Sequence, residues 1–250
     1  MELGKEITEA LSIHEFNIPL FGYNIPVSDT VIISWIIMIF IIGFAYFFTR
    51  KMVRIPSKKQ NFIEILVELV NNITEQSVGH HWKHFAPYLG TILLFLIVSN
   101  TISLFNIIPN WHQIYLFTGV EFFKELPSFG LRPPTKDINV TVSMAVMTII
   151  IVIGSGIRFK KVSGWLKSFF EHGIIMAPMK TMEYFTRILS LSLRLFGNII
   201  AAFIIMELLY AALPAFVPGI ASIYFDIFDG ILQAYIFVFL TSLYIAEAIE

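Results

Sequence analysis

Apolar runs long enough to cross a lipid bilayer dominate the hydropathy pattern of the chain. Three of these runs contain no charged residue: residues 30–48, 86–108 and 138–157. Two more, 182–213 and 220–249, are mostly apolar but are interrupted by a few ionisable groups. A membrane-spanning helix needs about 20 apolar residues, since the lipid core offers its backbone no hydrogen-bonding partner. The pattern therefore predicts an all-α polytopic membrane protein with five membrane-embedded helices.

The last two of these helices are expected to form a long, strongly tilted hairpin. Residues 214–219 contain two prolines and a glycine, a composition typical of a turn. At ~1.5 Å per residue, residues 182–213 extend over roughly 47 Å, against a hydrocarbon layer of ~30 Å. A helix of this length fits the membrane only if it tilts, and its partner in the hairpin must tilt with it.

Residues 61–79 have a different pattern, typical of a helix that lies at a surface. Their apolar side chains recur at helical spacing, whereas three glutamates lie elsewhere on the helical wheel. The apolar set is Phe62, Ile65, Leu66, Leu69, Val70 and Ile73, and the glutamates are Glu64, Glu68 and Glu75. The segment predicts an interfacial amphipathic helix rather than a span.

Lysine and arginine are unevenly distributed, and they predict the orientation in the membrane. The segment after the first run contains Arg50, Lys51, Arg54, Lys58, Lys59 and Lys83, and the segment after the third contains Arg158, Lys160, Lys161 and Lys167. Basic segments collect on the cytoplasmic side. We therefore expect a multi-pass protein of the plasma membrane, with an extracellular N-terminal tail at 1–29, an external loop at 109–137 and a cytoplasmic C-terminus. The run at 30–48 is expected to be an uncleaved anchor, because no basic segment precedes it.

Composition excludes several classes of function. Charged residues make up 14% of the chain and hydrophobic residues 56%, whereas soluble proteins have about 25% charged residues. The net charge of −1 provides no basic patch of the kind that binds nucleic acid. The absence of cysteine excludes disulfides, thiolate metal sites and thiol catalysis.

Arg194 is a permanent charge within an apolar helix. Apolar turns lie on both sides of it, and a guanidinium does not deprotonate in proteins. Arginine at the centre of a membrane costs about 2.5–3.5 kcal/mol on insertion scales. Ser190, Arg194 and Asn198 share one helical face, so small and polar side chains surround the charge. Arg194 is therefore expected to face a polar cavity or an acidic partner, the alternative being a side chain that snorkels to the headgroups.

Polar side chains on both sides of Arg194 predict an ion pathway along the hairpin. The candidates on the same helix are Glu183, three turns before Arg194, and Glu207, more than three turns after it; those on the next helix are Asp226, Asp229 and Gln233, at positions i, i+3 and i+7 of one face. A glutamine opposite an arginine can form a hydrogen bond without neutralising it. Acidic groups toward the end of the helix can line an aqueous entry path.

Three motifs contain the arginine, the glutamine and the loop before the third run. They are Leu193-Arg194-Leu195-Phe196-Gly197-Asn198, then Leu232-Gln233-Ala234-Tyr235-Ile236-Phe237 with Leu243-Tyr244, and Pro134-Thr135-Lys136-Asp137-Ile138-Asn139-Val140-Thr141. Together they resemble subunit a of the rotary, F-type ATP synthase membrane sector of bacteria. The resemblance covers the whole chain, and the arginine and glutamine motifs at this separation are highly specific.

The resemblance implies a stator subunit whose tilted hairpin lies against a rotating ring of c subunits. Two offset half-channels would pass protons or sodium ions to and from the ring carboxylates, and Arg194 matches the essential arginine. Asn198 and Gln233 match polar positions beside it. The implied partners are the c-ring, the peripheral-stalk subunit b and the lipid bilayer. No cofactor, bound nucleotide or enzymatic activity of the chain by itself is expected.

Two positions depart from the family's pattern. The family usually has an ionisable residue nine positions after the arginine, where this chain has Phe203, and commonly has His or Glu at the position of Asp226. Glu207 and Asp229 are expected to take over the outer half-channel.

Other readings of the sequence predict different functions. A secondary transporter that binds an anionic solute at Arg194 is the main alternative, although the repeats and broken helices typical of transporters are not evident. An intramembrane protease would need a Gly-x-Gly-Asp or Gly-x-Ser-Gly motif, which the sequence lacks. His80, His81 and His84 could suggest a metal site, but they lie at an interfacial helix end, and no metal is expected there.

Overall fold

The computed structural model describes residues 15–20, 23–50, 52–53, 58–102, 133–170, 176–212, 220–221 and 223–249. Its elements are β1 (Glu15–Leu20), β2 (Tyr23–Ser28), α2 (Asp29–Thr49), α3 (Lys58–Val78), the 3₁₀ turn η1 (Gly79–His81), α4 (Trp82–Thr101), the 3₁₀ turn η4 (Pro134–Lys136), α6 (Ile138–Phe170), α7 (Met176–Ala212), the π-helical η5 (Ile223–Asp229) and α9 (Gly230–Ile249). Five helical stretches among these residues are long and apolar enough to cross a membrane. The prediction of an all-α polytopic membrane protein is confirmed.

The predicted helices are present, with shifted ends. α2 covers residues 30–48, whereas α6 continues beyond residue 157 to Phe170, across a kink at Lys161. α3 coincides with the predicted amphipathic helix, although its place at the membrane interface stays a prediction. Most of the predicted external loop and the turn at 214–219 lie outside the described residues.

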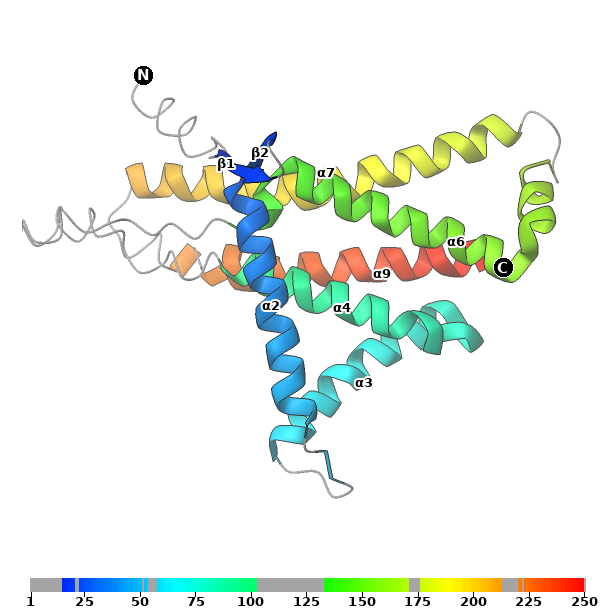
Figure 1. Ribbon diagram of the computed structural model, residues 1–250, viewed down its shortest axis with the longest axis horizontal. Helices are drawn as coiled ribbons and strands as arrows, with labels where there is room; N and C mark the ends of the chain where they lie inside the picture. The colour runs from blue at the N-terminus through cyan, green and yellow to red at the C-terminus, as the bar shows by residue number, and fades with distance from the viewer. Residues whose placement is uncertain are drawn as a thin grey trace, which may run out of the picture.

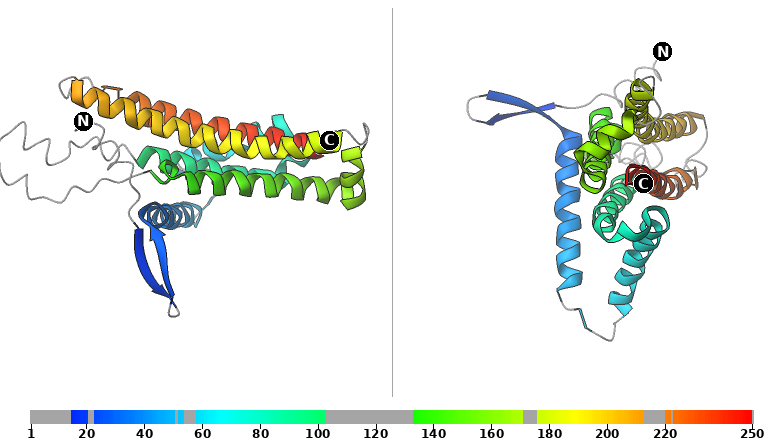
Figure 2. Two further views of the ribbon diagram at one scale, coloured as in Figure 1. Left: turned by 90° about the horizontal axis from the view of Figure 1, so that it is seen from above. Right: turned by 90° about the vertical axis from the view of Figure 1, so that its right-hand side faces the viewer.

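A short antiparallel hairpin, β1–β2, precedes α2 and was not predicted. Its register pairs Glu15 with Ser28 and Leu20 with Tyr23. Each strand contains a proline, which weakens the sequence pattern of a strand because proline cannot donate to the ladder. The hairpin projects away from the helices (Figure 2), so no apolar face against a core identifies it in the sequence.

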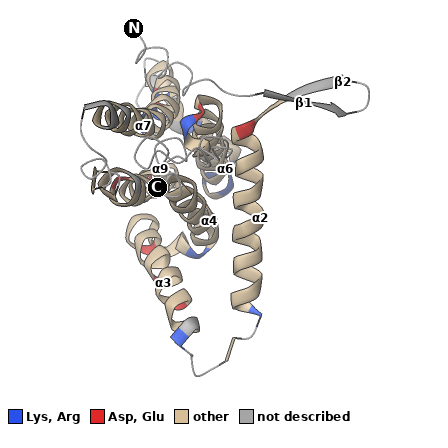
Figure 3. Cartoon of the chain, turned by 90° about the vertical axis from the view of Figure 1, so that its left-hand side faces the viewer, with Lys and Arg blue, Asp and Glu red and all other residues tan. Residues whose placement is uncertain are grey.

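α6, α7 and α9 run along the length of the molecule, and α2 crosses them (Figure 1). Charged residues of α2 and its flanks lie only at its two ends (Figure 3). The apolar side chains between those ends stay exposed, with Ile39 70% and Phe47 77% accessible. A helix that exposes large apolar side chains over its whole length is stable where lipid, rather than water, surrounds it.

The hydrophobic core lies where α4, α6, α7 and α9 meet. Leu96 of α4, Val152 of α6, Leu195 of α7 and Ile245 of α9 are all fully buried in it. Gly230 lets the start of α9 approach α4 closely, because a Cβ there would lie 3.1 Å from the Cβ of Asn100. This core holds α7 and α9 in place on one side and leaves other faces of both helices exposed.

Candidate functional site

Arg194 lies on an exposed face of α7. Leu191 and Leu195, on either side of it, are buried in the core and fix the rotation of the helix. Ser190 and Gly197 lie on the same exposed face as Arg194, so short side chains flank the guanidinium. Within the described part of the chain, Arg194 has no hydrogen bond and no ion pair. The structure therefore presents a permanent positive charge on an open helix surface.

A direct side-chain contact links α7 to the helix that follows it. Asn198 Nδ2 donates a hydrogen bond to Asp229 Oδ2, at the junction of η5 and α9. Arg194 precedes Asn198 by four positions and Gln233 follows Asp229 by four, and the two helices run antiparallel (Figure 1). Arg194 and Gln233 therefore lie at the same level of the hairpin.

Gln233 is buried, and the N–H donor of its side-chain amide is unpaired within the described residues. Only 4% of the residue is accessible, and its Nε2 has no hydrogen-bond partner among the described residues. A buried amide donor without a partner costs free energy, so such groups are rare in stable folds and common at functional sites. The sequence identified the residue but gave no sign that this donor is unused.

Phe203, where the family pattern has an ionisable residue, is covered by a lysine from a different element. Lys136 Nζ of η4 lies 3.5 Å from the centroid of the Phe203 ring. A cation over an aromatic face at this distance is attracted by the ring quadrupole. A positive charge therefore approaches α7 nine residues after Arg194, and sequence reasoning missed it because the two residues are far apart in the chain.

Buried hydrogen bonds fasten the helix ends on the same side of the molecule as Lys136. Asp137 accepts bonds from Thr30 Oγ1 at 2.8 Å and from the backbone N–H of Asn139 at 2.9 Å. Thr135 Oγ1 donates to Asn100 Oδ1 at 2.9 Å, and Asn100 Nδ2 donates to the carbonyl of Gly230 at 3.0 Å. The loop motif seen in the sequence thus connects α2, α4, α6 and α9.

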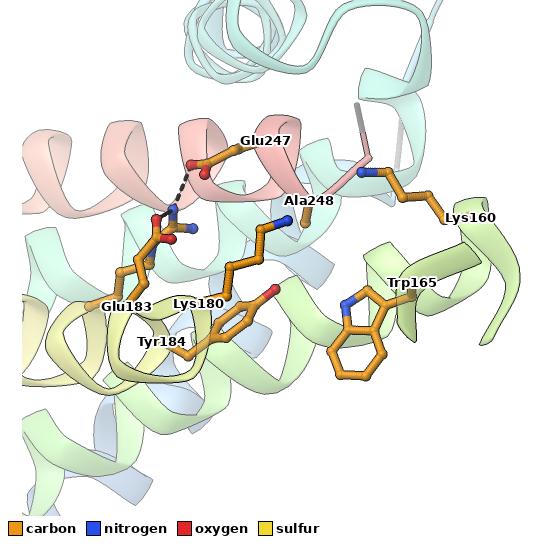
Figure 4. A pocket seen from close by; sticks show the side chains of 8 residues that line it. Lys160, Trp165, Lys180, Glu183, Tyr184, Glu247 and Ala248 are labelled. Carbon is orange, nitrogen blue, oxygen red and sulfur yellow. Dashed lines mark hydrogen bonds and ion pairs between the residues drawn. The ribbon is translucent and has the colours of Figure 1, made fainter. Parts of the chain in front are cut away.

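Near the N-terminal end of α7, Arg187 joins two glutamates from different helices. Its guanidinium donates to Glu183 on its own helix and to Glu247 Oε2 of α9 at 2.6 Å. It also lies 4.4 Å from the centroid of the Tyr244 ring. We call Glu183, Arg187 and Glu247 the clasp (Figure 4). The sequence pattern indicated a role for Glu183 but not for the other two residues.

For two candidate residues of the ion pathway, Glu207 and Asp226, the structure describes the backbone but not the side chain. Glu207 belongs to α7, and Asp226 belongs to the π-helical η5. The α-helical spacing that put Asp226 on one face with Gln233 does not hold through a π-helical turn. The expected absence of a metal stays untested: the described residues contain no group of three His, Asp or Glu side chains that could hold one.

Comparison with known proteins agrees with the fold and the motifs. The family model described as "ATP synthase A chain" matches residues 31–246. A relative named "ATP synthase subunit a, sodium ion specific", from Propionigenium modestum, is 35% identical over 227 residues, which is 91% of this chain and 76% of the relative. Another, "ATP synthase subunit a" from Gloeobacter violaceus, is 34% identical over 251 residues, covering 100% of this chain and 91% of the relative. The chain therefore belongs to the ATP synthase A chain family, and its function is the ion-translocating stator role predicted from the sequence.

Proposed function

We propose that Arg194 is the fixed charge that faces the ion-binding carboxylates of a rotating c-ring. The observation that carries this proposal is the environment of Arg194: an exposed guanidinium on a helix face of short side chains, with no acidic partner among the described residues. A cation at membrane depth needs an opposite charge or a polar cavity. A ring of passing carboxylates supplies the opposite charge from outside the chain.

The direction of the chemistry follows from electrostatics. A ring carboxylate crosses the lipid-facing part of its path neutral, with its ion bound, because a buried charge is costly. Beside Arg194 the ionised form becomes favourable, since an opposite charge lowers the pKa of a carboxylate. The ion then leaves, and the same fixed charge repels cations that would leak directly between the two half-channels. A potential of about 100 mV supplies about 2.3 kcal/mol per charge moved.

The two half-channels are assigned to opposite ends of the α7–α9 hairpin. The outer path would contain Asn198, Gln233, Asp226, Asp229 and Glu207, and the inner path would contain Glu183 and Ser190. The bond from Asn198 to Asp229 and the unused donor of Gln233 support the outer assignment. The inner assignment rests on the predicted orientation, which places the N-terminus outside, the C-terminus in the cytoplasm and the first turns of α7 on the cytoplasmic side.

The proposed partners are the c-ring, the peripheral-stalk subunit b and the surrounding lipid. In this proposal the chain needs no cofactor, binds no nucleotide and acts within the ATP synthase complex rather than as an enzyme alone. The transported ion is a proton or a sodium ion. Sodium dependence of ATP hydrolysis by the purified complex distinguishes these two ions, and the measurement is needed because the Propionigenium relative is named as sodium ion specific.

The test compares Arg194→Ala with Leu193→Ala in membrane vesicles. Leu193 is its exposed neighbour, so this control removes a side chain from the same surface without changing a charge. Arg194→Ala is expected to abolish ion-driven ATP synthesis while the complex still assembles, as judged on native gels. Leu193→Ala is expected to retain synthesis. Ion-driven synthesis in the Arg194→Ala complex would refute the assignment.

A further inference from the structure

A small cavity opens at the N-terminal end of α7, beside the clasp. Its volume is about 50 Å³, and its lining comes from α6, α7 and α9 (Figure 4). A water molecule needs roughly 10–15 Å³ of such space and several polar partners, so the cavity has room for water. Glu183, Arg187 and Glu247 supply polar partners, and Lys160 and Lys180 also line the cavity.

The charges of the clasp are arranged with the cation inside and the anions toward solvent. The side chain of Arg187 is 11% accessible, whereas those of Glu183 and Glu247 are 45% and 61% accessible. The guanidinium is further enclosed by the rings of Tyr244 and, at 5.9 Å, Tyr184. Arg187 thus bridges two helices from a sheltered position, and its two carboxylates remain open to ions from the aqueous side.

A line of polar side chains continues from the clasp to Arg194. Glu183, Arg187, Ser190 and Arg194 follow one another at i, i+4, i+7 and i+11, which is one face of α7. The two arginines are seven positions apart, so they lie ~10.5 Å apart along the helix axis. Ser190 lies between them on the exposed surface. Leu191, which also lies between the two arginines, is buried in the core.

We propose that Arg187 is a positioning residue that gates the inner end of the ion pathway, with Glu247 as the group that exchanges the ion with the cytoplasm. The closed state is the bridge between α7 and α9. An arriving cation, a proton or a metal ion, competes with Arg187 for Glu247, and the bridge opens toward the polar line that leads to Arg194. The inference rests on the proposed function and adds two residues, Arg187 and Glu247, to the inner half-channel.

The gate makes Arg187 important for rate as well as for structure. With Arg187 present, each carboxylate returns to a partner after the ion has passed, so no cation is retained at the entrance. Without Arg187, no guanidinium bridges Glu183 and Glu247. The residues that remain around them are Lys160, Lys180, Tyr184 and Tyr244. Removing the guanidinium takes one positive charge from beside the two carboxylates, which favours their protonated form even with Lys160 and Lys180 lining the same cavity. Exchange with the cytoplasm is then slower.

The experiment measures ATP-driven ion pumping by the whole complex in inverted vesicles, where ions enter from the cytoplasmic face. Glu247→Gln and Arg187→Gln are each expected to lower the initial pumping rate by about tenfold, which corresponds to about 1.4 kcal/mol on the barrier. Both are also expected to change how the rate depends on the pH of the cytoplasmic face. Glu68→Gln, which neutralises an exposed carboxylate of α3, is the matched control and is expected to pump normally.

The outcomes separate this inference from the proposed function. Unchanged pumping and an unchanged pH profile in Glu247→Gln and Arg187→Gln would overturn the gate, while loss of pumping in Arg194→Ala would still support the role of Arg194. A purely structural role of the clasp predicts less assembled complex with a normal rate per complex, and this result would also overturn the gate. Arg187→Lys keeps the charge and is expected to recover part of the rate.

Discussion

Asn100 offers the sharpest test of how the helix ends are held together. The residue is 1% accessible and connects α9 to the loop before α6, through Gly230 and Thr135. Asn100→Ala would remove both bonds and leave the buried hydroxyl of Thr135 without this acceptor. We expect the variant to be less stable and the start of α9 to be the first part of the hairpin to loosen.

The magnitude follows from the two bonds. Hydrogen bonds between helices of a membrane protein average about 0.6 kcal/mol, which gives about 1.2 kcal/mol for the pair. A buried polar group left unsatisfied adds about 1–3 kcal/mol, because its desolvation is no longer compensated. The expected loss in free energy of unfolding is therefore about 2–4 kcal/mol. Thr135→Val in the same background should cost little more, since its main partner is already gone.

The assay is unfolding of the purified chain in mixed micelles by titration with SDS, followed by tryptophan fluorescence. Asn139→Ala is the matched control, because the Asn139 side chain is exposed and only its backbone N–H bonds to Asp137. The control is expected to change the free energy of unfolding by less than about 0.5 kcal/mol. Equal costs for Asn100→Ala and Asn139→Ala would refute the reasoning, since the buried bonds would then contribute nothing.

Two further predictions concern the outer path and the kink of α6. Asp226→Asn combined with Asp229→Asn should slow ion entry from outside, because the acidic groups that attract cations are lost; unchanged ion-driven synthesis and pumping in the double variant would remove both residues from the pathway. Lys161 has φ 61° and ψ 159°, a conformation that costs residues other than glycine about 1–3 kcal/mol. Lys161→Gly should therefore raise the free energy of unfolding by about 1 kcal/mol in the same SDS titration, whereas Lys160→Gly, in helical backbone, should lower it by a similar amount.

The parts of the fold that sequence reasoning predicted are those set by local pattern. The predicted spans depend on runs of apolar residues, and the described part of each run is helical. The exposure of Arg194 also has a local cause, since the neighbouring Leu191 and Leu195 lie on a different face of the helix, which is buried in the core. The hairpin β1–β2 has no such pattern and was missed.

The contacts that sequence reasoning missed join residues far apart in the chain. Asp137 was noticed as part of a motif, but its partner Thr30 is 107 residues away, and no spacing rule connects them. The same holds for Lys136 with Phe203 and for Arg187 with Glu247, 60 residues apart. Such pairs are fixed by the way the helices cross, which depends on the packing of the whole core rather than on any one segment.

The two arginines of α7 show why the surroundings of a charge, rather than the charge alone, decide its role. Arg187 and Arg194 lie on the same face of one helix, seven residues apart. Arg187 is compensated by two carboxylates and enclosed by tyrosines, whereas Arg194 is open and uncompensated within the described residues. In the proposed mechanism, a passing ring carboxylate would therefore be attracted to Arg194 and not to Arg187. Loss of both glutamates of the clasp would leave Arg187 uncompensated as well, two turns away from Arg194.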